Sequence, residues 1–295
     1  MLICWEACDL AALFRHGQAI LGGLCAVLLA ACCAASSSQL HCWKDEGTLL
    51  ARIPASNSNA IGHADYASYL MHHGQLARAQ AECEKAIVIS PHYLPLPALL
   101  GKILLDEGKV DEAIQKFQFI LRMDPTLDIA RVELGRAFLA KKRPAEAGEE
   151  FKTVLRNDAN NFEAHHGLGR AYLFQGRIAD AISEFRASLT LDANQPDTLN
   201  DLAWLLATDS HPEIRHGAEA VQWAKRACAL TQGQEPIFLG TLAAAFAETG
   251  DFDNAVAAGQ KAHYLALAQG RKELADANLQ LLTFYRAHKP FHQKQ

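Results

Sequence analysis

Leu134 to Asn160 reads LGRAFLAKKRPAEAGEEFKTVLRNDAN, and Leu168 to Asn194 reads LGRAYLFQGRIADAISEFRASLTLDAN. The second stretch begins 34 residues after the first and repeats its order of small, large and charged residues. Self-similarity at a fixed period of this size indicates a repeat architecture, in which each repeat is one supersecondary unit. The fold is therefore predicted from what the repeats share.

Six repeats fit the same register along the chain. In each of them the seventh and eleventh residues are large and the eighth is small. Residues four apart share one face of a helix, and a small residue beside them lets a neighbouring helix approach closely. The twentieth residue is alanine every time, once about five inserted residues in the fifth repeat are allowed for. The repeats begin near Ala60, Leu94, Asp128, Phe162, Pro196 and Pro236.

Glycine marks the predicted turn inside most repeats. A helix often ends at a residue with left-handed backbone, and glycine adopts that conformation at little cost. Gly74, Gly108, Gly176 and Gly250 stand at this place, whereas the third repeat has Lys142. Acidic residues follow, near the positive end of the next helix dipole, at Asp111, Glu146, Asp180 and Asp253. Each repeat is thus predicted to be a helix, a tight turn and a second helix.

This period and pattern resemble the tetratricopeptide repeat, with Pro91 and Pro125 in its closing position. The resemblance implies an all-α fold, a right-handed superhelix of about six helix-turn-helix repeats over residues 60–270. Because one helix pair cannot bury its apolar face alone, the repeats stack and build an extended concave surface. Residues 271–295 are predicted to form a capping helix and tail, with Leu274, Ala277, Leu281 and Tyr285 on the apolar stripe.

The amino-terminal residues 1–42 form a separate segment that is predicted to be a membrane anchor or signal-like sequence. Ala19 to Ala35 is almost wholly apolar, and a bilayer core of about 30 Å needs roughly 20 such residues in a helix. A single membrane-spanning helix is favoured over a buried soluble helix. Leu29-Ala30-Ala31-Cys32 also resembles a lipobox, which would make Cys32 a lipidation site. Residues 43–59 are predicted to be a linker.

The linker carries a second resemblance. His41 to Leu50 reads HCWKDEGTLL and is similar to the segment that joins the last membrane helix to the repeats in O-mannosyltransferase-like proteins that combine transmembrane and tetratricopeptide parts. Trp43, Lys44, Asp45, Thr48 and Leu49 match that segment, and Glu46-Gly47 departs from it. This resemblance implies that the chain corresponds to the carboxy-terminal portion of such a protein, with its repeats outside the cytoplasm, in the periplasm of a bacterium.

Charge and motifs favour a binding protein over an enzyme. A formal net charge of −5 gives no basic surface for nucleic acid. The sequence has no Walker A, HExxH or GxSxG motif, so no catalytic residue, metal site or cofactor is predicted. Cys83 replaces the phenylalanine of other repeats and is interpreted as a buried hydrophobe rather than a reactive thiol. The insertion ATDSHPEIRH at 207–216 is interpreted as a surface loop rather than a dedicated site.

The tetratricopeptide resemblance also implies which residues line the concave groove. Its ninth position holds a cation in three successive repeats, and the neighbouring groove positions are aromatic or polar. Such a stripe either clamps an acidic segment or free carboxy terminus of a protein or peptide, or is a solvated face that aids solubility. The predicted groove residues are Lys102, Arg136, Arg170, His166, Phe174, Asn200 and Trp204.

These observations predict a membrane-anchored, single-pass scaffold that binds a protein or peptide in its groove. Two alternatives stay open. One is the substrate-recruiting region of a membrane glycosyltransferase of the O-mannosyltransferase-like kind, and the other is a lipoprotein that serves an assembly complex.

Overall fold

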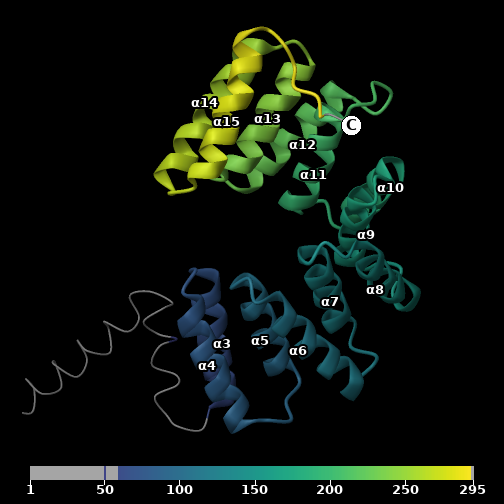
Figure 1. Ribbon diagram of the computed structural model, residues 1–295, viewed down its shortest axis with the longest axis vertical. Coiled ribbons are helices and arrows are strands. Elements are labelled where there is room, and N and C mark those ends of the chain that lie inside the picture. Colours follow the sequence, from purple (N-terminus) through teal and green to yellow (C-terminus); the bar gives the residue numbers. More distant parts are fainter. Residues whose placement is uncertain (1–49, 51–58, 294–295) are drawn as a thin grey trace, which may run out of the picture. The chain divides into compact units, whose positions relative to one another are not determined.

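The computed structural model describes residue 50 and residues 59–293 (Figure 1). Across this part of the chain the regular structure is all α-helix, in 13 helices, which confirms the all-α prediction. They are α3 (Ala60–His72), α4 (Leu76–Ile89), α5 (Pro95–Asp106), α6 (Val110–Met123), α7 (Asp128–Ala140), α8 (Pro144–Asn157), α9 (Phe162–Phe174), α10 (Ile178–Leu191), α11 (Pro196–Thr208), α12 (Gly217–Leu230), α13 (Pro236–Glu248), α14 (Phe252–Ala268) and α15 (Lys272–Arg286).

Several predictions concern residues outside the described ranges. The apolar segment Ala19 to Ala35, the lipidation site Cys32 and the Trp43 to Leu49 segment all lie there. Within residues 59–293, no helix is both long enough and apolar enough to cross a bilayer.

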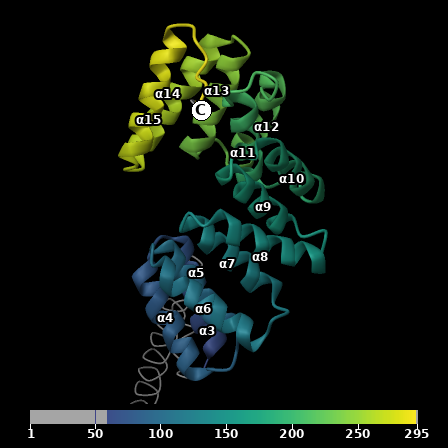
Figure 2. The same cartoon turned by 45° about the vertical axis from the view of Figure 1, so that its right-hand side comes forward.

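The chain divides into two compact bodies between Gly108 and Lys109. The N-terminal body contains α3, α4 and α5, and α4 packs against both of the others. The C-terminal body contains α6 to α15, and each of these helices packs on a helix next to it in the chain. In both views α13, α14 and α15 lie side by side (Figures 1 and 2). The first helix of each repeat starts at the predicted residue, except that α5 starts one residue later, at Pro95.

Small residues let the helices of the C-terminal body approach closely. All six alanines at the twentieth position are fully buried. The ring of Phe151 on α8 is also fully buried, between Gly135 on α7 and Gly167 on α9. A Cβ atom would lie 2.7 Å from that ring at Gly135 and 2.3 Å at Gly167, closer than real Cβ contacts. Glycine at these positions therefore sets the distance between consecutive helices.

Cys83 occupies the corresponding position in the N-terminal body and is fully buried on α4. Its Sγ lies 3.4 Å from the carbonyl oxygen of Leu96. Burial, with a smaller contribution from Glu84, raises the pKa of the Cys83 thiol to about 12. The thiol is therefore protonated at neutral pH, as suits a buried small hydrophobe.

The turns inside the repeats follow the sequence prediction. Gly74, Gly108, Gly176 and Gly250 have φ between 70° and 81°, and Lys142 has φ 57°, so all five adopt the left-handed region. Asp111, Glu146, Asp180 and Asp253 each stand in the first turn of a second helix. The predicted left-handed turns and acidic helix starts are both confirmed.

Lys142 is the place where this turn carries a conformational cost. A left-handed backbone destabilises a residue that has a Cβ by about 1–2 kcal/mol, and glycine avoids this strain. Glycine also makes the unfolded chain more flexible, which offsets roughly 0.5–1 kcal/mol of the gain. We expect Lys142→Gly to raise the free energy of unfolding by about 0.5–1 kcal/mol. Chemical denaturation measures it. The neighbouring Lys141→Gly is the control and should lower stability, because Lys141 has an ordinary φ of −83°.

Two details of the prediction need correction. In α15 the buried residues are Ala275, Asn278, Leu282 and Tyr285, whereas Ala277, placed on the apolar stripe from sequence, is exposed. The stripe is shifted because the helix presents a face centred one residue further along. The loop predicted at residues 207–216 is shorter in the structure, because α11 continues to Thr208. The right-handed sense of the superhelix stays a prediction.

Candidate functional site

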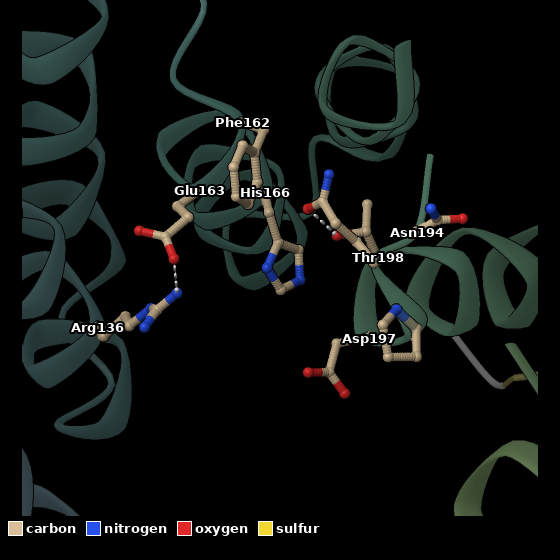
Figure 3. A pocket seen from close by; sticks show the side chains of 9 residues that line it. Arg136, Phe162, Glu163, His166, Asn194, Asp197 and Thr198 are labelled. Carbon is tan, nitrogen blue, oxygen red and sulfur yellow. Dashed lines mark hydrogen bonds and ion pairs between the residues drawn. The ribbon is translucent and has the colours of Figure 1, made fainter. Parts of the chain in front are cut away.

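The C-terminal body has a pocket of about 230 Å³ on α7, α9 and the start of α11 (Figure 3). In Figure 3, Arg136 and Glu163 stand on one side of it, His166 in the middle, and Asp197 and Thr198 on the other. The pocket is lined by Arg136, Phe162, Glu163, His166, Asn194, Gln195, Pro196, Asp197 and Thr198.

The pocket lies where the stacking of first helices changes. α7 packs directly on α9, and α11 packs directly on α13, but α9 and α11 do not pack on each other in this way. Gly167 lies against the Phe151 ring, whereas the residue 34 positions further on is Asp201. A carboxylate cannot take the place of a hydrogen atom beside a buried ring. Asp201 instead contacts polar groups of α9, which leaves room for the pocket.

Local capping fixes where α9 starts and so places its polar residues. The Asn161 side chain accepts a hydrogen bond of 2.9 Å from the backbone nitrogen of Ala164. Such a cap satisfies one of the free N–H groups at a helix start. Glu163 and His166 follow in the first turns, three residues apart and therefore on neighbouring parts of one face.

Arg136 reaches from α7 toward α9. Its Nη1 donates to Oε1 of Glu133 at 3.1 Å, and its Nη2 lies 3.7 Å from Oε1 of Glu163. The side chain of Arg136 is 38% exposed and that of Glu133 only 6%. The second distance is too long for a hydrogen bond, so the guanidinium keeps donor capacity toward the pocket.

Asp201 on α11 receives two groups from α9. Nε2 of His166 lies 3.2 Å from Oδ2 of Asp201, and Nε of Arg170 lies 3.8 Å from the same oxygen. The Arg170 side chain is 49% exposed. The ring of His166 is also 5.7 Å from the ring of Phe185, which holds the imidazole against α10. Arg170, like Arg136, therefore faces solvent and makes a long ion pair with the neighbouring repeat.

The predicted groove residues are thus divided by the structure. Arg136 and His166 line the pocket, and Arg170 joins them through Asp201. Lys102 lies on α5, in the N-terminal body.

Three further predicted residues lie away from the pocket lining. Phe174 is exposed at the last residue of α9. Asn200 is buried, and among the described residues its Oδ1 has no hydrogen-bond partner. Trp204 is half-buried on α11 and contacts the ring of Phe291.

Sequence reasoning missed the acidic half of the site. Glu133, Glu163 and Asp201 pair with the arginines or with His166, and Asp197 also lines the pocket. The cations share a register of 34 residues, but their partners come from the same or the next repeat at unequal spacing. A search for carboxylates in the first two turns of the following repeat would have found Glu163 and Asp201.

The arrangement offers hydrogen-bond donors and acceptors that can bind a polar ligand. Within the described residues no group of three or more His, Cys, Asp and Glu side chains could hold a metal ion. The half-exposed guanidinium groups can bind carboxylates, and Glu163 and Asp197 can accept from amides or cations.

The tetratricopeptide repeat family matches this chain at residues 104–171 and 138–205. These ranges include α7 to α10 and every residue that lines the pocket. Residues 104–205 therefore match the tetratricopeptide repeat family, and the helix pairs α7–α8 and α9–α10 within them have the helix-turn-helix form of such repeats. A comparison with curated protein sequences finds no match.

Solved structures show the same fold at low sequence identity. PilF of Pseudomonas aeruginosa is 20% identical with a TM-score of 0.56, over 74% of this chain and 96% of that one. A thermophilic tetratricopeptide-repeat protein of Thermus thermophilus is 21% identical with a TM-score of 0.50, over 66% of this chain and 98% of that one. A chain of the Cut9–Hcn1 hetero-tetramer of the APC/C is 13% identical with a TM-score of 0.66, over 79% of this chain and 46% of that one.

Proposed function

We propose that this protein is a membrane-anchored scaffold that binds an acidic segment or free carboxy terminus of a partner protein across α7, α9 and α11. The observation that carries the proposal is the pair of half-exposed arginines, Arg136 and Arg170, whose contacts with Glu163 and Asp201 are longer than hydrogen bonds. Stacked repeats provide the extended surface that such a segment needs.

A partner carboxylate can compete with the internal ones. Exposed ion pairs without hydrogen bonds stabilise a protein by about 0–1 kcal/mol. A charge-assisted hydrogen bond from arginine to a partner, partly removed from water, contributes about 1.5–3 kcal/mol. Exchange of Glu163 or Asp201 for a partner carboxylate is therefore favourable, and Glu163 and Asp201 become free to accept amide donors of the same segment.

Charge reversal at both arginines tests the proposal. The probe is a fluorescein-labelled acidic peptide with a free carboxy terminus, and its binding to the full chain is followed by anisotropy. We expect Arg136→Glu with Arg170→Glu to weaken binding at least tenfold, because one lost charged contact of about 1.4 kcal/mol suffices. An amidated copy of the peptide shows whether the terminal carboxylate or the acidic side chains bind.

The matched control reverses two positive charges on the second helices of the repeats. Lys116 on α6 and Arg156 on α8 are exposed and belong to second helices, away from the pocket. Lys116→Glu with Arg156→Glu should leave binding within about twofold, because neither residue lines the pocket and salt weakens the effect of exposed charges that do not touch the ligand. Equal losses in both double variants would show a general charge effect and refute the pocket.

The membrane part of the proposal rests on Ala19 to Ala35, which is apolar for about the length a spanning helix needs. We expect the full chain to stay with membranes after an alkaline carbonate wash, and Cys32→Ser to leave this unchanged. Release of Cys32→Ser from the membrane would instead favour the lipoprotein alternative, because a lipid anchor on that cysteine would be lost.

A further inference from the structure

The chain's last described residues fold back over the C-terminal body. After α15 ends at Arg286, the backbone nitrogen of Lys289 donates to the carbonyl oxygen of Phe284 at 3.0 Å. His288 has a left-handed φ of 54°, and its ring lies 5.1 Å from that of Phe252. The chain therefore reverses at His288, and residues 289–293 form a tail that returns to the C-terminal ends of α11 and α13 (Figure 1).

An aromatic contact seats this tail. The ring of Phe291 lies 6.2 Å from that of Trp204 on α11 and 5.6 Å from that of Phe284 on α15, edge-on to the latter. Both distances fall within the range of about 4.5–7 Å at which aromatic pairs attract. Phe291 thus bridges α11 and α15.

Polar contacts hold the end of the tail. The backbone nitrogen of Gln293 donates to the carbonyl oxygen of Thr208 at 2.8 Å, and Nε2 of Gln293 donates to Oγ1 of Thr208 at 2.9 Å. Nε2 of His292 lies 2.7 Å from Oε2 of Glu248 on α13. The first of these contacts uses a free carbonyl at the end of α11, which any peptide backbone could satisfy.

The insertion in the fifth repeat helps to build this seat. Arg215, near its end, donates from Nε to Oε1 of Glu248 at 2.9 Å and from Nη1 to the carbonyl oxygen of Asp209 at 2.9 Å. The side chains of Arg215 and Glu248 are only 14% and 15% exposed. A carboxylate fixed by one arginine still has an oxygen with which to accept a second donor, here His292.

We propose that the surface formed by Trp204, Thr208, Glu248 and Phe284, the tail cradle, binds a partner peptide that carries an aromatic residue followed by a hydrogen-bond donor. The chain's own tail occupies the cradle as a tethered competitor. The occupant's chemistry is shown by the tail itself: one ring, one donor for Glu248 and one backbone N–H for Thr208.

The tail lies on the surface of the cradle and is not enclosed by it. None of residues 289–293 is buried, and Phe284 remains 42% exposed beneath the tail. A tethered segment acts at an effective concentration of about millimolar, so a partner must bind the cradle more tightly than the tail to displace it. This second surface does not depend on Arg136 and Arg170.

Peptide binding in trans tests the cradle. The probe is a fluorescein-labelled peptide of residues 286–295, RAHKPFHQKQ, titrated with the full chain and with a chain that ends at Ala287. We expect the shortened chain to bind it at least tenfold more tightly, because the tethered competitor is gone. A peptide with Phe291→Ala should bind the shortened chain at least tenfold more weakly than the parent peptide.

Point variants of the full chain serve as controls in case the shortened chain does not fold. Phe291→Ala should bind the peptide more tightly than the parent chain does, with an unchanged helical spectrum. Lys289→Ala, whose exposed side chain lies in the same tail, should behave as the parent does. The double charge reversal at Arg136 and Arg170 should also bind it as the parent does, which separates this inference from the proposed function. Equal binding by the parent, shortened and Phe291→Ala chains, or binding by none of them, would overturn it.

Discussion

Phe151→Ala should lower the free energy of unfolding by about 3–5 kcal/mol, the range for deletion of a buried phenylalanine. The ring of Phe151 is fully buried on α8 and contacts the backbone surface of α7 and α9 at Gly135 and Gly167. Its removal opens a cavity at the junction of two repeats. Because glycine has no side chain to move into the space, the cavity cannot fill by local repacking.

Denaturant unfolding followed by helical circular dichroism measures this loss. Phe119→Ala on α6 is the matched control, since it removes the same side chain from a position that is 47% exposed. We expect the control to change the free energy of unfolding by less than about 1 kcal/mol. Similar losses in the two variants would show that Phe151 is not the contact between repeats that the packing indicates.

Gly167→Ala should lower the free energy of unfolding by about 1–3 kcal/mol, the usual cost of overpacking a core. An alanine Cβ at this position would lie 2.3 Å from the Phe151 ring, and that ring is enclosed. The loss is expected although alanine favours a helix over glycine by about 0.8–1 kcal/mol. Denaturant unfolding gives the sign of the change, which is the decisive result.

Gly148→Ala on α8 is the control for helix propensity. Its Cβ would meet side-chain atoms at 3.8–3.9 Å, which is ordinary contact, so we expect a gain of stability. Combining Gly167→Ala with Phe151→Ala should also turn the loss at Gly167 into a gain, because the colliding ring is absent. A gain from Gly167→Ala in the parent chain would contradict the close approach of α8 and α9.

The helices and their packing followed from sequence because the rules that set them are local and repeat every 34 residues. Gly176 and Lys142 occupy the equivalent turn of two successive repeats, and both adopt the left-handed backbone that this position requires. Cys83 stands in a phenylalanine position and is buried as a phenylalanine is. In each case the position within the repeat determines the backbone conformation and the burial of the residue. The residue type then determines how stable the fold is with that residue there.

The site could be predicted only in part because its partners do not follow the repeat. The tetratricopeptide resemblance implies Arg136 and Arg170 as groove residues. Glu163 and Asp201, which partly neutralise them, depend on the distance between one repeat and the next. A tail after the capping helix was predicted, but its contacts could not be predicted from the sequence. Its contact between Gln293 and Thr208 spans 85 residues, and no periodic pattern connects the two.

Photo-crosslinking of the acidic peptide to the full chain tests the central proposal, a binding groove on the first helices, most directly. A photoreactive group at the end of the peptide marks the helices beside it, and mass spectrometry of the digest locates the adducts. We predict adducts on α7, α9 and the start of α11, lost when Arg136 and Arg170 are both replaced by glutamate. Adducts confined to α8 and α10, or unchanged in the double variant, would contradict the groove.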